Sequence, residues 1–181
     1  MLFYDKMKKG GIVVNEFYKV LNYVNENLYQ PNRLLISDVK EEVQNSEYGA
    51  GVFQLNEKLV RFRVAKITPN KTGQFVVFWE KDKNGKNQAF SYEKAPDLLV
   101  INTFTEHKFG QFVFPKEILI KQNILKTTDT KGKMAMRVYP GWEKPISKQA
   151  IKTQKWQLDY FIEIDDTNNF PVQELLQFYV N

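Results

Sequence analysis

Apolar residues follow a helical period most clearly in the segment 15–31. They recur at intervals of three and four residues, so on a helix they form one stripe that can face a core. Asn15 can cap the start of this helix, and Pro31 follows its end. The members of the stripe are Phe17, Val20, Leu21, Val24 and Leu28. The pattern predicts an amphipathic helix packed against the rest of the protein.

Shorter apolar runs in the middle of the chain predict β-strands. Residues 50–55 and 59–67 flank a three-residue turn, which predicts a hairpin. Residues 73–81 are apolar on both faces of a strand, and this favours a central position in a sheet. Further strands are expected at 97–104, 110–115 and 134–140.

Helices are predicted again toward the C-terminus. One follows Pro115, another begins after the N-cap residue Ser147, and a last one has Pro171 in its first turn. The segment 37–49 is expected to add a short helical turn. A helix followed by strands and then by helices indicates an α/β fold, α+β by strand order. We expect a single domain, residues 1–181, with a central mixed β-sheet flanked by helices.

Composition narrows the class of protein. The chain has 181 residues, of which 43% are hydrophobic, enough to bury a core. No apolar run approaches the ~20 residues that span a bilayer, and the N-terminus lacks the order of a signal peptide. The absence of cysteine excludes disulfides and zinc-thiolate sites. We expect a cytoplasmic protein without membrane contact.

The net charge of +5 is distributed unevenly. Residues 61–155 hold 19 basic and 8 acidic side chains, a net of +11, whereas residues 156–181 hold 5 acidic and no basic ones. If the basic segment folds into one positive face, it favours a polyanion as partner. The alternative is that the lysines only solvate a strand-rich surface.

Basic residues around the second predicted strand are candidate phosphate ligands. Arg61 and Arg63 lie on one face of the strand and Lys66 on the other. A guanidinium group can bind phosphate through two hydrogen bonds, but an internal salt bridge is an equal alternative for this pair. Lys71 lies in the following turn, which is also compatible with a plain β-turn.

The segment 152–157 combines cations, amides and an aromatic ring. Such a set can contact phosphates, stack on bases and form hydrogen bonds with base edges. The alternative is a solvated helix anchored in the core by its tryptophan. The residues are Lys152, Thr153, Gln154, Lys155, Trp156 and Gln157.

Hydrolytic sites find little support in the sequence. The single histidine, His107, lies in a polar turn, so a histidine-rich metal site is impossible. A serine nucleophile would depend on this same histidine, and the sequence lacks the strand-turn-helix motif in which such a serine is usually found.

Four motifs, in this order, resemble those of the MepB family of small bacterial proteins: RFRVAKITPNKTGQFVVFW, FGQFVFPKEIL, RVYPGW and KTQKWQLDYF. The resemblance covers residues 47–162. It implies a restriction-endonuclease-like fold of the PD-(D/E)XK type and a cytoplasmic location. It also implies nucleic-acid binding as the suggested role.

A nuclease of that fold places an acid on one core strand and an acid-x-Lys sequence on the next, where they hold a divalent metal. The strand 59–67 instead carries two arginines, and Lys66 has Val64 two residues before it. This departure speaks against metal-dependent cleavage. If cleavage occurs, displaced residues such as Glu47, Glu80 and Lys66 would have to support it with Mg or Mn.

Three functional hypotheses remain open from the sequence. The first is a protein on a degenerate nuclease-like scaffold that binds DNA, RNA or a nucleotide and needs no cofactor. The second is the metal-dependent nuclease, and the third is a regulatory protein that binds a protein partner or an anionic metabolite. For the first, Gln74, Gln111 and Arg137 join the basic residues and the segment 152–157 as candidate ligand contacts.

Overall fold

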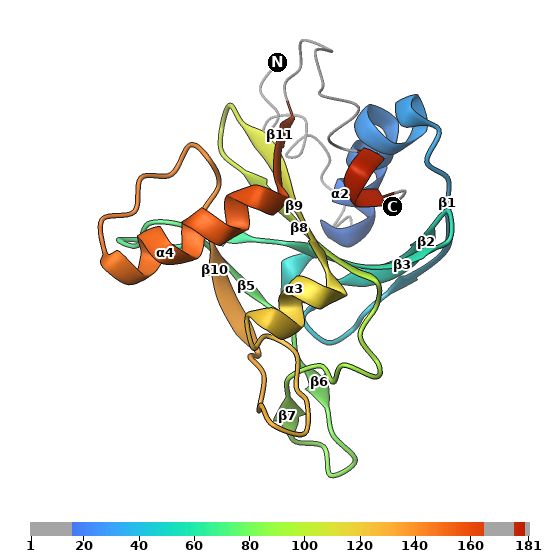
Figure 1. Ribbon diagram of the computed structural model, residues 1–181. Helices are drawn as coiled ribbons and strands as arrows, with labels where there is room; N and C mark the ends of the chain where they lie inside the picture. Colours follow the sequence, from blue (N-terminus) through green and yellow to red (C-terminus); the bar gives the residue numbers. More distant parts are fainter. Residues whose placement is uncertain (1–15, 165–175, 180–181) are drawn as a thin grey trace.

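The computed structural model describes residues 16–164 and 176–179. Its largest sheet has six strands in the order β1-β2-β3-β8-β9-β11 (Figure 1). Strands β3 and β8 are parallel and the other neighbours are antiparallel, so the sheet is mixed. The strands are β1 (Ile36–Glu41), β2 (Gly51–Leu55), β3 (Lys58–Val64), β8 (Leu98–Phe104), β9 (Phe109–Pro115) and β11 (Phe161–Ile164).

A second, three-stranded sheet continues from β3 and has the order β10-β5-β4. Its strands are β4 (Lys66–Ile67), β5 (Gln74–Val77) and β10 (Ala135–Val138), all antiparallel. A short hairpin of β6 (Glu80–Lys81) and β7 (Asn87–Gln88) extends away from both sheets at the bottom of Figure 1.

Helices cover both faces of the central sheet (Figure 1). Helix α2 (Glu16–Val24) continues as a π-helical segment, Asn25–Tyr29, and a 3-10 turn, Gln30–Asn32. Helices α3 (Lys116–Lys121) and α4 (Lys148–Gln157) lie on the opposite side of the sheet. Two further 3-10 turns are Ser46–Tyr48 and Leu158–Tyr160.

The two faces of β8 and β9 belong to different apolar clusters. In β8, Leu98 and Val100 pack with α2, whereas Leu99 and Ile101 pack with α3 and β5. Alternate side chains point to opposite faces of a strand, so a strand buried on both sides is apolar at nearly every position. The structure is a mixed α+β fold with a central mixed sheet flanked by helices, as the sequence predicted.

Most of the predicted elements are present. All five residues of the apolar stripe in 15–31 are at most 1% exposed. The helical turn expected within 37–49 is mostly wrong: residues Ile36–Glu41 form β1, and only Ser46–Tyr48 is helical. The helix after Ser147 ends at Gln157, and the sequence did not predict the strand β11 that follows it. Asn15 and Pro171 lie outside the described residues.

None of the helices in the described part of the chain has the length and apolar character needed to cross a membrane.

Candidate functional site

Two adjoining cavities lie along helix α4 and strand β10. The larger has a volume of about 420 Å³ and the smaller about 240 Å³. We call their combined lining the α4 groove. The larger cavity is lined by Gln122, Ile124, Lys133, Ala135, Met136, Arg137, Tyr139, Ser147, Gln149, Ala150, Lys152, Thr153, Trp156 and Gln157. The smaller is lined by Lys71, Thr72, Arg137, Tyr139, Pro145, Ile146, Ser147 and Ala150, four of which it shares with the larger.

Side-chain amides fix α4 against β10. Gln157 is fully buried; its Nε2 donates to the Arg137 carbonyl at 2.9 Å, and its Oε1 accepts from the Tyr139 N–H at 2.9 Å. Gln154 Nε2 donates to the carbonyls of Pro140 and Glu143, at 3.2 and 2.8 Å. The amides satisfy backbone groups that no strand pairs, so Gln154 and Gln157 hold the groove together instead of facing a ligand.

The start of α4 is set by a side-chain cap. Ser147 has an extended backbone conformation, and its Oγ accepts a hydrogen bond from the Ala150 N–H at 3.2 Å. This is the N-cap geometry that the sequence predicted. Because the cap fixes the first turn, the side chains that follow at helical spacing, including Thr153 and Trp156, face the groove.

The described lining of the α4 groove is cationic. It contains Lys71, Lys133, Arg137 and Lys152 and neither aspartate nor glutamate. The ion pairs found between described residues involve none of these four cations. Clustered positive charge without a neighbouring carboxylate produces a local positive potential that attracts anions.

Arg137 lies at the junction of the two cavities and is held by neutral acceptors. Its Nη1 donates to the Gly73 carbonyl at 3.0 Å and its Nη2 to Thr68 Oγ1 at 2.7 Å. The guanidinium carbon lies 5.7 Å from the centre of the Phe75 ring. These contacts orient the guanidinium without neutralising it, so its charge and its remaining N–H groups are available to an anion.

The turn that supplies the Gly73 carbonyl requires glycine. Gly73 has a φ of +80°, and a Cβ at this position would lie 2.6 Å from the Tyr139 ring. Only glycine adopts this conformation readily and leaves space for the ring. The glycine therefore permits the close approach of the 68–73 turn to β10.

The larger cavity also has apolar walls. Ile124, Met136 and Trp156 are among its lining residues. The indole of Trp156 is half-buried and packs against the Phe114 ring, with 5.3 Å between ring centres. Trp156 thus anchors α4 in the core, which was one of the two interpretations of this residue from the sequence. Part of the indole ring also lines the cavity.

Six of the thirteen predicted contact residues line the α4 groove. They are Lys71, Arg137, Lys152, Thr153, Trp156 and Gln157. Arg61 and Arg63 are outside this lining, so the two basic clusters do not border one groove. Lys155 is exposed on α4 but lines neither cavity.

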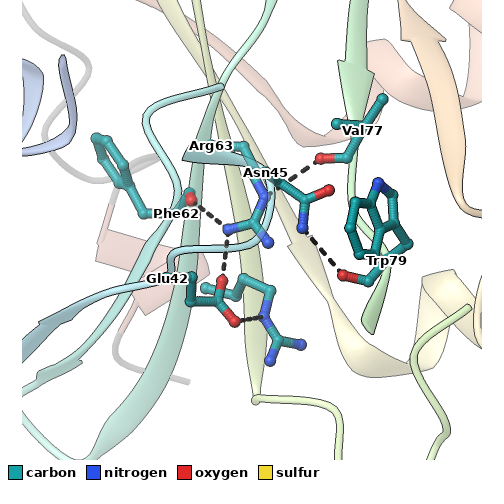
Figure 2. A network of polar contacts seen from close by, with 7 residues as sticks. Glu42, Asn45, Phe62, Arg63, Val77 and Trp79 are labelled. Atoms are coloured by element: carbon teal, nitrogen blue, oxygen red, sulfur yellow. Dashed lines mark hydrogen bonds and ion pairs between the residues drawn. The ribbon is translucent and has the colours of Figure 1, made fainter. Parts of the chain in front are cut away.

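Arg61 and Arg63 form an internal ion-pair network with Glu42 (Figure 2). Glu42 Oε2 lies 2.7 Å from Arg63 Nη1, and Glu42 Oε1 lies 3.3 Å from Arg61 Nε. Arg63 is 0% exposed and also donates to the carbonyls of Phe62 and Val77. The interpretation of Arg63 as a phosphate contact is therefore corrected, because a fully buried guanidinium does not face a ligand in solvent.

Burial lowers the pKa of the Arg63 guanidinium to about 10, and the nearby carboxylate of Glu42 opposes this effect. At neutral pH the side chain is charged, and it links β3 to the second sheet through the Val77 carbonyl. Beside it, Asn45 Nδ2 donates to the Trp79 carbonyl at 2.9 Å (Figure 2). The network connects three segments of the fold around one buried cation.

Gln74 and Gln111 are both buried, and their amides form hydrogen bonds within the protein. Gln74 is 1% exposed, and its amide donates to the Phe104 carbonyl at 3.0 Å. Gln111 is 0% exposed; its Nε2 donates to Asn102 Oδ1 at 2.7 Å, and its Oε1 accepts from the Tyr179 hydroxyl at 3.0 Å. Both amides are satisfied within the core, so they are not ligand contacts.

The three residues considered for a nuclease, Glu47, Glu80 and Lys66, lie in three different segments of the fold. Glu47 is exposed on the Ser46–Tyr48 turn, and Glu80 accepts a hydrogen bond from Gln88 at 3.1 Å. The Lys66 ammonium lies 4.9 Å from the centre of the Tyr48 ring. Within residues 16–164 and 176–179, no group of three acidic or histidine side chains is placed to hold a metal ion.

Several groove residues were not singled out from the sequence. Lys133, Gln122 and Gln149 lie in different segments, and only the packing of β10, α3 and α4 brings them to one cavity. One signal in the sequence was usable: Lys133 directly precedes the predicted strand 134–140 of the basic segment, and Arg137 lies within it. Glu42 was missed as the arginine partner because it precedes Arg61 by 19 residues.

Comparisons with known proteins identify relatives of this chain. A family model described as MepB-like matches residues 42–163. A solved structure described as "Crystal Structure of MepB" is 40% identical to this chain, with a TM-score of 0.72; the match covers 84% of this chain and 97% of that one. The comparison with curated proteins found no match. The structural likeness fits the restriction-endonuclease-like fold that the motifs implied.

Proposed function

The chain belongs to the MepB-like family, and from this membership and the α4 groove we propose that it binds nucleic acid or a nucleotide. The scaffold is of the nuclease type, and the groove on it serves binding. Phosphate groups contact Lys71, Arg137 and Lys152, which lie along the two adjoining cavities.

One observation carries the proposal: the described lining contains four cations and no carboxylate. Phosphate neutralisation by lysine and arginine supplies most of the affinity in nucleic-acid binding that is independent of sequence. Arg137 adds a fixed guanidinium that forms no ion pair within the described part of the chain, and it can form two parallel hydrogen bonds with one phosphate.

Fluorescence anisotropy with a labelled single-stranded oligonucleotide tests the proposal. We expect binding at low salt that weakens steeply as salt rises, because each neutralised phosphate releases counterions. The variant Lys71→Ala/Lys152→Ala removes two groove cations, so the slope of log K against log salt should fall by about 1.4, or 0.7 per phosphate contact.

The matched control is Lys83→Ala/Lys86→Ala. It removes the same charge from two exposed lysines of the β6–β7 hairpin, at the bottom of Figure 1. The control should keep the slope of the unmodified protein. Absence of binding to any oligonucleotide or mononucleotide at low salt would refute the proposal, and so would an equal loss in both variants.

A further inference from the structure

The larger cavity of the α4 groove combines features that phosphate binding does not need. Ile124, Met136 and the indole of Trp156 give it apolar walls, and it encloses about 420 Å³. This volume is in the range of about 300–1,000 Å³ found for small-molecule sites. A row of surface lysines is sufficient to bind a phosphate backbone. The apolar cavity therefore indicates that the ligand also has an apolar group, which binds there.

Two side-chain amides of the lining are free to bind that group. Gln122 is half-buried and Gln149 is exposed, and neither side-chain amide bonds to another described residue. Gln157, by contrast, uses both of its amide atoms on the backbone of β10. A free amide offers a donor and an acceptor side by side, and the edge of a nucleobase presents the complementary pair.

The adjoining cavity supplies the place for a phosphate. Arg137 lines both cavities, and Lys71 and Thr72 line the smaller one. A nucleotide likewise consists of a flat, largely apolar base with polar edges, connected through a sugar to an anionic group. The larger cavity holds Lys133 and Lys152 as well, so cations line both cavities. A nucleotide with its base against the apolar walls of the larger cavity can therefore place its phosphate at the junction, beside Arg137.

We propose that the larger cavity is a nucleobase subsite, in which the amides of Gln122 and Gln149 bind the base edge while Arg137 and Lys71 hold the adjoining phosphate. The inference rests on the proposed function and extends it, because it assigns part of the affinity to a base and not to the backbone alone. The apolar walls exclude water from the base, and the fixed indole of Trp156 provides a rigid surface against it.

The test compares two labelled strands of ten positions with the same backbone charge. One carries abasic sites throughout, and the other carries a single adenine at its centre. We expect the single base to raise the affinity roughly 10-fold, within the range measured for base contacts on protein surfaces. Adenine is chosen because glutamine forms a bidentate pair with it.

The variant Gln122→Ala/Gln149→Ala should lose most of this gain and keep the affinity for the abasic strand. Both side chains are at least partly exposed, and their amides have no partner among residues 16–164 and 176–179, so folding should be unaffected. The matched control is Gln44→Ala, an exposed glutamine outside the groove, which should behave as the unmodified protein.

The outcomes separate the two proposals. Equal affinity for both strands overturns the base subsite and leaves the proposed function standing if binding is salt-sensitive. A gain from adenine that survives in the double variant places the base elsewhere and also overturns the inference. The proposed function itself is rejected if neither strand binds and ordinary oligonucleotides do not bind either.

Discussion

Replacing Glu42 with glutamine should strongly destabilise the fold, although the change preserves the size of the side chain. Glu42 is the carboxylate that contacts both Arg61 and Arg63 (Figure 2). The exposed fractions of these arginine side chains are 12% and 0%. The substitution removes the negative charge and leaves the Arg63 cation buried without a counterion.

The magnitude follows from the burial of the pair. Removing one partner of a buried ion pair costs about 3–5 kcal/mol, because the remaining charge loses its compensation. Glu42 is itself 20% exposed, so water replaces part of the lost interaction and the lower end applies, about 3 kcal/mol. This is a large share of the roughly 5–15 kcal/mol that stabilises a folded protein. For a chain of this length it corresponds to a fall in Tm of about 6–12 °C.

Urea denaturation followed by tryptophan fluorescence measures the change in the free energy of unfolding. The control is Glu47→Gln, which neutralises an exposed carboxylate in the same part of the chain and should change stability by less than about 0.5 kcal/mol. The double variant Glu42→Gln/Arg63→Met should cost less than the sum of its single changes, because it removes both charges. A loss below about 1 kcal/mol for Glu42→Gln, or equal losses for both glutamine variants, would refute the reasoning.

Three further predictions concern other buried contacts. Burial raises the pKa of Tyr29 from 10.0 to about 12, so the folded state holds this proton more tightly than the unfolded state. Stability of about 3 kcal/mol is therefore fully present below pH 10 and is lost as the pH rises through about 12. Denaturation at several pH values should show a shallower decline for Tyr29→Phe, and equal declines would contradict the assignment. Gly73→Ala should cost about 1–3 kcal/mol more than Gly85→Ala in thermal unfolding, since both have positive φ but only the first Cβ meets the Tyr139 ring. Gln157→Leu should cost about 2–4 kcal/mol by leaving two backbone groups of the β10 segment unpaired; an unchanged urea midpoint and unchanged oligonucleotide affinity would show that α4 is held by other contacts.

The elements with strong periodicity could be predicted from the sequence, and the edges of the central sheet could not. Helix α2 and strands β8 and β9 bury complete faces, so their apolar patterns are long and regular. Strand β1 is an edge strand with mostly exposed or half-exposed residues. Its register shifts between Ser37 and Lys40, and Asp38 has a φ of +51°. A bulge of this kind interrupts the alternation by which a strand is recognised.

The sequence predicted which types of residue line the candidate site, but not which individual residues do. The sequence shows that arginines and lysines concentrate in residues 61–155, but a strand pattern does not reveal whether a cation meets a carboxylate. That depends on tertiary register: the residue that follows β1 reaches the arginines of β3 across the fold. Likewise, Gln74 and Gln111 were candidate ligand contacts from the sequence, yet each finds partners on other segments.

The basic residues of this chain therefore separate into two groups with different physical roles. Arg61 and Arg63 are matched to a carboxylate inside the fold, whereas Lys71, Arg137 and Lys152 line a groove in which the described residues include no carboxylate. The two groups should respond oppositely to the same measurements. Glu42→Gln should lower the free energy of unfolding and leave the salt dependence of oligonucleotide binding unchanged under folding conditions. Lys71→Ala/Lys152→Ala should reduce the salt dependence and leave unfolding nearly unchanged, because solvent-facing lysines contribute little to stability. If both variants changed both quantities together, the division between a structural network and a binding groove would be wrong.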